Sequence, residues 1–299
     1  MTKIILTSTA STIDGVLGQL YSELEWADGL ELRVDLLDDA TEAEIASLPA
    51  RLPSRPDRPL ELVCTVRRTI DGGRSDLADE RRLALLAVAV ESGYTHIDLE
   101  ADLEPTPGHE DLVARAAEVG VTIIRSLHDF SGVPDDLARA IDALPRSARE
   151  IPKAAVMPRS TRDLVRLLAI ARSLGPRDRI VLGMGEFGFP TRVLGAVMGN
   201  CLTFASAAAA APGHVSPETL DRLYRVRSHG PATRYFAVIG DPISHSKSPE
   251  YHNTRFADDG IDAVYLPVRV DDVDAFFDLA AQIPLLGCSV TIPHKQAVI

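Results

Sequence analysis

The stretch Ile-Pro-Lys-Ala-Ala (151–155), with residues 161–174 and Ile-Val-Leu-Gly (180–183), decides the fold. Its two short runs are almost continuously apolar, whereas residues 161–174 between them place apolar side chains at helical spacing after Ser160. A strand with one face in water would alternate polar and apolar residues, so these runs predict parallel strands buried on both faces. The segment between them predicts a helix.

The same alternation of a short apolar run and a helical segment extends from this stretch in both directions. The runs lie at residues 3–6, 29–34, 60–65, 95–99, 121–125, 151–155, 180–183 and 200–204. Eight strands, each followed by a helix or a short helical candidate, within about 225 residues have the size and rhythm of a (β/α)8 barrel. The fold class predicted is α/β, a TIM barrel followed by a partial second α/β domain.

The rhythm breaks at Arg-Ser-His-Gly-Pro-Ala-Thr (227–233), where glycine and proline disfavour a continuing helix. We therefore predict a barrel over residues 1–228, a linker at 229–233 and a second unit over 234–299. Strands are expected in the second unit at 235–239, 263–268 and 287–290, with helices at 249–259 and 273–281. Three strands and two helices are too few to resemble a finished domain.

The formal net charge of −12 favours small molecules as partners, because an acidic surface repels nucleic acid and anionic lipid. Cys64, Cys201 and Cys288 match neither a disulfide framework nor a metal-ligand spacing, so no metal is expected. No apolar run is long enough for a signal peptide or a membrane span. These features predict a cytoplasmic protein, and homodimerisation is left open.

Charged residues gather where the predicted strands end, which is where barrel enzymes place their sites. They are Glu31, Arg33, Asp35, Arg67, Arg68, His128, Asp129, Lys153 and Arg192. An anionic substrate would have to be met by individual arginines among these residues, because the overall field opposes it.

Lys153 and His128 are the pair with the clearest chemistry. A lysine held among apolar walls and other cations releases its proton more readily and can attack a ketone. Histidine exchanges protons near neutral pH. On residue type alone, however, such a lysine is more often paired with a carboxylate, and such a histidine is more often a hydrogen-bonded core residue. Their combination on successive strands is the informative feature.

Several strings together resemble the type I 3-dehydroquinate dehydratase family over roughly residues 1–225. They are Glu-Leu-Arg-Val-Asp (31–35), Cys-Thr-Val-Arg (64–67), Ser-Leu-His-Asp-Phe (126–130), Lys153, Gly-Met-Gly-Glu-Phe-Gly (183–188), Thr-Arg (191–192) and Ala-Pro-Gly-His (211–214). The resemblance implies dehydration of 3-dehydroquinate to 3-dehydroshikimate in the shikimate pathway, without a cofactor. Lys153 would form an imine with the C3 ketone, and His128 would move the protons.

The same resemblance assigns the remaining residues of the site. Glu31, Arg33 and Arg67 would hold ring hydroxyls, Arg192 would hold the carboxylate, and Thr7 and His214 would be further substrate contacts. Three positions depart from the family pattern: Asp71 replaces the glutamate that orients the histidine, Ala210 replaces a serine, and His214 replaces a glutamine.

Residues 234–299 resemble the substrate-binding start of shikimate dehydrogenase, through segments 240–253 and 287–295. That likeness implies shikimate contacts from Ser246, Ser248, Thr291 and Lys295, with Lys295 also catalytic. Ser289 departs from the usual asparagine. The likeness further implies NADP as the cofactor of a full-length dehydrogenase, whose nucleotide-binding domain we do not expect in this chain.

Two other functions are compatible with the sequence. A class I aldolase-type barrel also uses a lysine imine, but no phosphate-binding glycine turn follows the last two barrel strands. A non-catalytic barrel that binds a quinate-like acid is suggested by the altered lid residues. Trapping of an imine on Lys153 would separate these alternatives.

Overall fold

Eight parallel strands form the first sheet of the computed structural model, which describes residues 1–38, 40–145, 147, 149–176, 178–206 and 215–299. The strands pair in the order β7-β6-β5-β4-β3-β2-β1-β8. Their bounds are β1 Lys3–Thr7, β2 Gly29–Arg33, β3 Glu61–Thr65, β4 His96–Glu100, β5 Thr122–Asp129, β6 Glu150–Val156, β7 Ile180–Gly183 and β8 Leu202–Ala205. The predicted TIM-like fold class is confirmed.

The sheet closes between β7 and β8 mainly through one side chain. Asn200 accepts a hydrogen bond from the Val181 backbone N–H and donates one to the Val181 carbonyl, both at 2.9 Å. The Cys201 N–H also donates to the Arg179 carbonyl. The Asn200 side-chain amide thus takes the place of strand-to-strand backbone hydrogen bonds where β7 and β8 meet.

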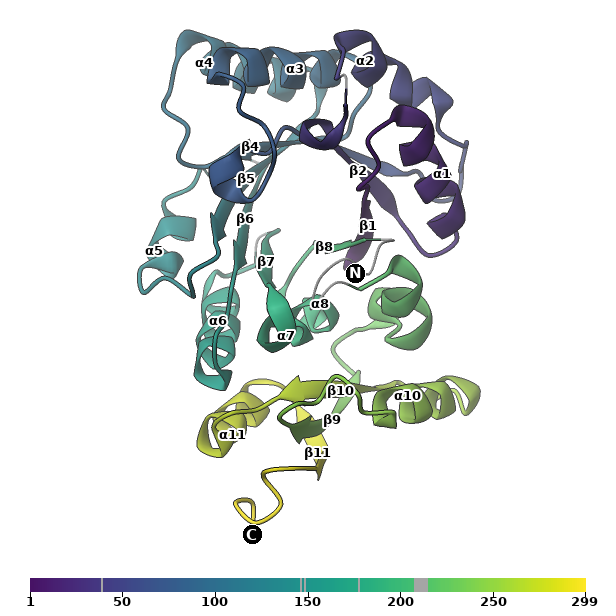
Figure 1. Ribbon diagram of the computed structural model, residues 1–299, viewed down its shortest axis with the longest axis vertical. Coiled ribbons are helices and arrows are strands. Elements are labelled where there is room, and N and C mark those ends of the chain that lie inside the picture. Colours follow the sequence, from purple (N-terminus) through teal and green to yellow (C-terminus); the bar gives the residue numbers. More distant parts are fainter. Residues whose placement is uncertain (39, 146, 148, 177, 207–214) are drawn as a thin grey trace.

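Helices surround the strands on the outside (Figure 1). They are α1 Ile13–Glu23, α2 Glu42–Arg51, α3 Asp79–Glu91, α4 Pro107–Val119, α5 Leu137–Asp142 and α6 Thr161–Ser173, followed by one-turn helices α7 Gly185–Gly188, α8 Pro190–Val193 and α9 Gly195–Met198. Side-chain caps fix several starts: Thr41 and Glu44 form a capping box, and Ser160 accepts from the Asp163 N–H. A π-helical turn at Thr219–Leu223 follows β8.

The second unit is a three-stranded parallel sheet in the order β10-β9-β11. Its elements are β9 Arg234–Gly240, α10 Ser248–Asp258, β10 Ala263–Arg269, α11 Val273–Gln282 and β11 Leu285–Val290. Figure 1 shows it beside the part of the barrel formed by α6, α7 and α8. The partial α/β unit predicted from the sequence is therefore present.

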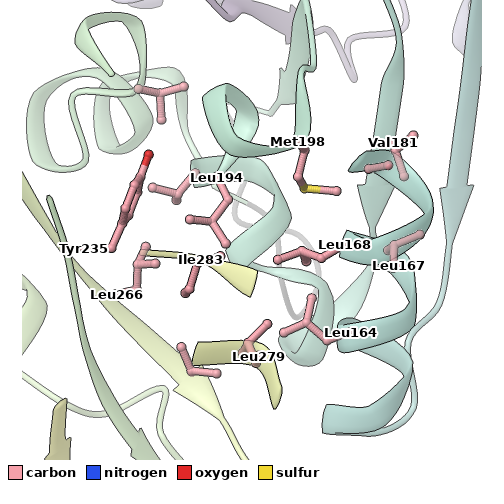
Figure 2. Close-up of a cluster of buried hydrophobic side chains, with 14 of the residues drawn as sticks. Leu164, Leu167, Leu168, Val181, Leu194, Met198, Tyr235, Leu266, Leu279 and Ile283 are labelled. Carbon is pink, nitrogen blue, oxygen red and sulfur yellow. The ribbon is translucent and has the colours of Figure 1, made fainter. Parts of the chain in front are cut away.

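The barrel interior is filled by a small apolar cluster that includes Ile5, Val63, Ile124 and Phe204. A second cluster lies between the first strands and helices α1 to α4. A third joins the barrel to the second unit: Leu164 and Leu168 of α6 pack in one cluster with Leu279 of α11. Figure 2 shows these side chains meeting across the boundary. The two units thus share one hydrophobic core.

Polar contacts reinforce this boundary. Asp271, after β10, accepts hydrogen bonds from the Thr161 N–H at 2.8 Å and the Thr161 hydroxyl at 2.6 Å. Arg162 pairs with Asp272 at 2.7 Å. In the part of the chain that the structure describes, no helix is both long and apolar enough to cross a membrane.

Candidate active site

A cavity of about 220 Å³ lies at the carboxyl ends of the barrel strands. It is lined by Thr7, Glu31, Arg33, Arg67, Asp71, Gly72, His128, Phe130, Lys153, Ala155, Leu182, Met184, Arg192 and Phe204. A larger hollow of about 880 Å³ lies at the opposite, amino-terminal ends of the strands. None of the predicted barrel site residues lines that larger hollow, so the smaller cavity is the candidate site.

Eight of the predicted barrel site residues meet in this one cavity. They are Thr7, Glu31, Arg33, Arg67, Asp71, His128, Lys153 and Arg192. His214, predicted as a substrate contact, and Ala210, the other lid departure, lie outside the described residues. The barrel brings these side chains together because the carboxyl ends of parallel strands share one rim.

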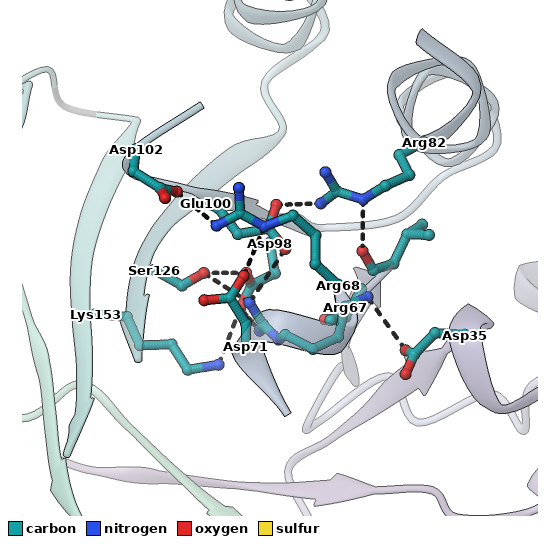
Figure 3. Close-up of polar contacts among 12 residues, drawn as sticks. Asp35, Arg67, Arg68, Asp71, Arg82, Asp98, Glu100, Asp102, Ser126 and Lys153 are labelled. Atoms are coloured by element: carbon teal, nitrogen blue, oxygen red, sulfur yellow. Dashed lines mark hydrogen bonds and ion pairs between the residues drawn. The ribbon is translucent and has the colours of Figure 1, made fainter. Parts of the chain in front are cut away.

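The Lys153 ammonium is held between a carboxylate and an aromatic ring. Its Nζ lies 2.9 Å from Asp98 Oδ2 and 4.2 Å from the centroid of the Phe204 ring. Asp98 is the third residue of β4, and its side chain points into the barrel, as does that of Ser126 on β5 (Figure 3). The lysine is thus paired with a carboxylate, as residue type alone favours.

Asp98 is shared among several donors. It accepts from Arg67 at 2.8 Å and from the Ser126 hydroxyl at 2.6 Å. Arg67 also lies 3.6 Å from Glu100, which pairs in turn with Arg82. Burial alone would raise the pKa of Asp98, but Arg67 and Lys153 hold it well below its usual range. Asp98 therefore stays ionised.

No role was predicted from the sequence for Asp98, Glu100 or Ser126. Asp98 and Ser126 lie within their strands, whereas Glu100 is the last residue of β4. A signal was available in His-Ile-Asp-Leu-Glu (96–100), where polar residues alternate with apolar ones in an otherwise buried strand. Such alternation aims the polar residues at one face, here the barrel interior.

His128 is surrounded by cations. Burial, followed by the charges of Arg67 and Lys153, lowers the pKa of His128 to about 2. Its imidazole is therefore neutral near physiological pH. Among the described residues, the His128 Nδ1 atom has no hydrogen-bond partner. An unpartnered neutral imidazole in a cavity can accept a proton from a ligand.

Asp71 lines the same cavity but its carboxylate pairs with a different residue. Arg68 Nε donates to Asp71 at 2.6 Å, and the same guanidinium contacts Asp102 at 2.6 Å. Gly72 follows in a left-handed conformation, φ +77°, under the ring of Phe130. A Cβ at this glycine would lie 2.4 Å from the ring, so Gly72 allows Phe130 to cover the cavity edge.

The remaining polar wall has ordered partners. Glu31 accepts hydrogen bonds from the hydroxyls of Thr7 and Thr65, both at 2.7 Å. Arg33 makes a two-point contact with Asp35 at 2.7 and 2.8 Å. These bonds fix the side chains before any ligand enters, which is the usual basis of a preorganised site.

Arg192 differs from the other cavity cations because it pairs with no carboxylate in the described part of the chain. Its guanidinium donates to the Phe204 carbonyl at 2.6 Å, and its Nε atom has no partner there. Burial lowers the pKa of Arg192 to about 10. A buried and uncompensated guanidinium would gain from an anion that enters the cavity.

The predicted residues of the second unit lie on two segments whose backbones meet. The Asp241 N–H donates to the Ile292 carbonyl at 3.1 Å. Ser246 accepts from the Ser248 N–H at 3.3 Å, Thr291 packs its methyl against Gly240, and Lys295 is exposed. Ser289, the departure from the family pattern, accepts a hydrogen bond from the Tyr265 hydroxyl at 2.7 Å.

No group of three histidine, cysteine or carboxylate side chains placed to hold a metal ion occurs within the described ranges. The ionisable cluster of the barrel consists instead of alternating carboxylates and cations, which pair with each other.

Comparison with known proteins gives a family match for each of the two units. Residues 4–231 match the family model of type I 3-dehydroquinase, and residues 238–299 match that of the shikimate dehydrogenase substrate-binding domain. The chain is 30% identical over 278 residues to the "bifunctional 3-dehydroquinate dehydratase/shikimate dehydrogenase, chloroplastic" of Arabidopsis thaliana, covering 91% of this chain and 45% of that one. It therefore spans less than half the length of that relative.

A single-function relative and a solved structure extend the likeness. The 3-dehydroquinate dehydratase of Methanococcus vannielii is 31% identical over 219 residues, which cover 71% of this chain and 94% of that one. The dehydroquinate dehydratase and shikimate dehydrogenase structure of S. pombe AroM superposes with a TM-score of 0.63 at 24% identity, covering 99% of this chain and 57% of that one, and so supports the fold. The chain belongs to the type I 3-dehydroquinase family, and its residues 238–299 match the shikimate dehydrogenase substrate-binding domain.

Proposed function

We propose that the first unit converts 3-dehydroquinate to 3-dehydroshikimate through an imine on Lys153. The observation that carries the proposal is the meeting, in one cavity, of Lys153, a neutral His128 and the uncompensated Arg192. The substrate offers a ketone and a carboxylate on one ring. A single ligand can therefore engage the lysine and the arginine together, which orients the ring.

The chemistry balances without a cofactor. The Lys153 amine adds to the C3 ketone, and water leaves as the iminium forms. His128 then removes the C2 proton, so that the electrons of the C–H bond form an enamine. The enamine expels the hydroxyl, which leaves as water after His128 returns the proton. Hydrolysis of the resulting imine by water releases the product and restores the amine.

Imine formation requires the ammonium proton of Lys153 to leave first. Asp98 is a poor acceptor because neighbouring cations hold its pKa well below the usual range. His128 is neutral and faces the same cavity. The substrate carboxylate offsets the cations that lower the pKa of His128, so binding makes the imidazole a stronger base.

The other predicted site residues have supporting roles in this proposal. Glu31, Arg33 and Arg67 contact ring hydroxyls, Thr7 and His214 are further contacts, and Asp71 acts on His128 only after it leaves Arg68. The Arg67 guanidinium also contributes a fixed positive charge to the cavity, because its contacts with Asp98 and Ser126 hold it in place.

For the second unit we propose shikimate contacts from Ser246, Ser248, Thr291 and Lys295, with Lys295 as a catalytic lysine. A dehydrogenase built on this unit would use NADP. The junction between the units is placed at residues 229–233, with domains at 1–228 and 234–299. A cytoplasmic location and small-molecule partners stay predictions from the sequence, and homodimerisation stays open.

The decisive test is reductive trapping. Incubation with 3-dehydroquinate and borohydride should add to the peptide that contains Lys153 the mass of the trapped ligand plus two hydrogens less one water, and Lys153→Ala should abolish both the adduct and the turnover. Turnover by Lys153→Ala above about a tenth of the wild-type rate would contradict the proposal. An aldolase-type enzyme would instead trap a sugar phosphate. A non-catalytic barrel would bind the acid without any adduct.

A further inference from the structure

The segment 184–194 joins the barrel cavity to the second unit. Two of its residues, Met184 and Arg192, line the cavity. The same segment is contacted from outside by residues that follow the barrel in sequence. His229 Nδ1 lies 3.2 Å from the Val193 carbonyl oxygen, and Leu194, fully buried, packs in one cluster with Tyr235 and Leu266 (Figure 2).

Arg269 makes the polar contact between the second unit and this segment. It is the last residue of β10, opposite Gly240 at the end of β9. Its Nη1 donates to Glu186 at 3.0 Å, and its Nε donates to Asp241 at 2.9 Å. The guanidinium carbon lies 4.7 Å from the centroid of the Phe187 ring. One side chain therefore joins helix α7 of the barrel to the 240–248 segment of the second unit.

The turn that Arg269 holds is connected tightly to Arg192. A Cβ placed on Gly183 would lie 2.5 Å from the Gly188 Cα, so the ends of this turn are in direct backbone contact. The Thr191 hydroxyl donates to the Gly188 carbonyl at 2.7 Å and accepts from the Gly183 N–H at 2.8 Å. A shift of α7 must therefore move Thr191 and its neighbour Arg192, because close-packed backbone cannot absorb it locally.

We propose that Arg269 is a positioning residue for the barrel site: through Glu186 and Phe187 it fixes the segment that presents Arg192 to the substrate carboxylate. The inference rests on the proposed dehydratase function for its kinetic consequence. The effect of Arg269 on the order of residues 184–194 does not depend on that function. Through Arg269, the second unit would therefore influence ligand binding at the barrel site.

The chain offers a matched control for the test. Arg162 pairs with Asp272 across the same boundary, and among the described residues its side chain makes no hydrogen bond or ion pair with α7 or α8. Arg269→Gln, Glu186→Gln, their double variant and Arg162→Gln would each be measured for KM and kcat with 3-dehydroquinate. Hydrogen exchange of the 184–194 backbone amides would be followed in the same four proteins.

Loss of Arg269 should raise KM by about fivefold while kcat changes less than about twofold. The reason is that Arg192 binds the substrate carboxylate equally in the ground state and the transition state, so misplacing it weakens binding alone. Glu186→Gln should do the same, and the double variant should add little, as expected for a contacting pair. Amides of 184–194 should exchange faster in these variants, whereas Arg162→Gln should resemble the wild type.

Three results would overturn the inference: an unchanged KM in Arg269→Gln and Glu186→Gln, a fall in kcat at constant KM, or a raised KM without faster exchange in 184–194. An equal effect of Arg162→Gln would overturn it as well, since the cause would then be general weakening of the boundary. Absence of turnover in the wild type would refute the dehydratase assignment instead, and the exchange experiment would still decide the structural claim.

Discussion

Lys153 Nζ and Asp98 Oδ2 lie 2.9 Å apart, although their strands, β6 and β4, are separated by β5. The pair is buried, and Asp98 is kept ionised by Arg67. In the proposed reaction, in which Lys153 becomes an iminium, the site keeps one positive charge at nearly the same place. The carboxylate that balances the resting ammonium can therefore also balance the intermediate, without reorganisation of the site.

Asp98→Asn should accordingly lower kcat and slow borohydride trapping, by about 10²-fold if the carboxylate acts as a preorganised counter-charge. Ser126→Ala is the control, because it removes a hydrogen bond to the same carboxylate and leaves the charge. The expected order of rates is wild type, then Ser126→Ala, then Asp98→Asn. A rate for Asp98→Asn at the wild-type level would exclude this role.

His128→Ala should leave a slow enzyme that still forms the adduct, though more slowly than the wild type, because the Lys153 amine remains and water can take its proton in place of the imidazole. General acid–base help from histidine is typically worth about 10²–10⁴-fold. Steady-state kcat and the mass of the trapped Lys153 peptide would be measured together. Loss of the adduct along with turnover would show that His128 is needed for imine formation itself.

Acid should destabilise the fold partly through His128. Its folded pKa, about 2, lies below the usual value of 6.5, so between these limits the unfolded chain binds a proton that the folded chain refuses. Stability must therefore rise with pH across this window. His128→Gln should flatten the slope of unfolding free energy between pH 4 and 6 by up to about 1.4 kcal/mol per pH unit. Urea titrations at several pH values would measure it; an unchanged slope would contradict it.

Arg192→Met should lower the affinity for the substrate without lowering the stability of the fold. Substrate affinity should fall by about 10- to 100-fold, since hydrogen bonds to charged groups contribute roughly 1.5–3 kcal/mol. The melting temperature should stay the same or rise, because the variant removes a buried charge that has no carboxylate partner in the described residues. A large fall in melting temperature would indicate that Arg192 has a structural role instead.

The barrel strands were predictable because continuous apolarity is a local signal. The expected run at 180–183 coincides with β7, and most others differ from the observed strands by one or two residues. β5 extends further than expected, to Asp129, because His128 and Asp129 pair with Ala155 and Val156 of β6. Such pairing depends on a strand about 25 residues away in sequence and leaves no local pattern.

The site was predictable only at its rim. His128 and Arg192 follow apolar runs and Lys153 lies within one, so their position at the cavity could be inferred from the fold. The hydrogen-bond and ion-pair partners within the site could not be inferred in the same way. The sequence offers Asp71 several cations, for example, and its pairing with Arg68 depends on loop geometry. Arg269 had no signal at all, since its role arises only where two units meet.

The apolar cluster shared by α6 and the second sheet has a thermodynamic consequence. Leu164, Leu168 and Leu194 are fully buried there, and separating the units would return such side chains to water at about 1.5–3 kcal/mol each. We therefore expect heat or denaturant to melt both units in one cooperative transition, and a protease cut at the junction to leave fragments that remain associated. The boundary that divides two family matches along the sequence is therefore not expected to divide two autonomous folding bodies.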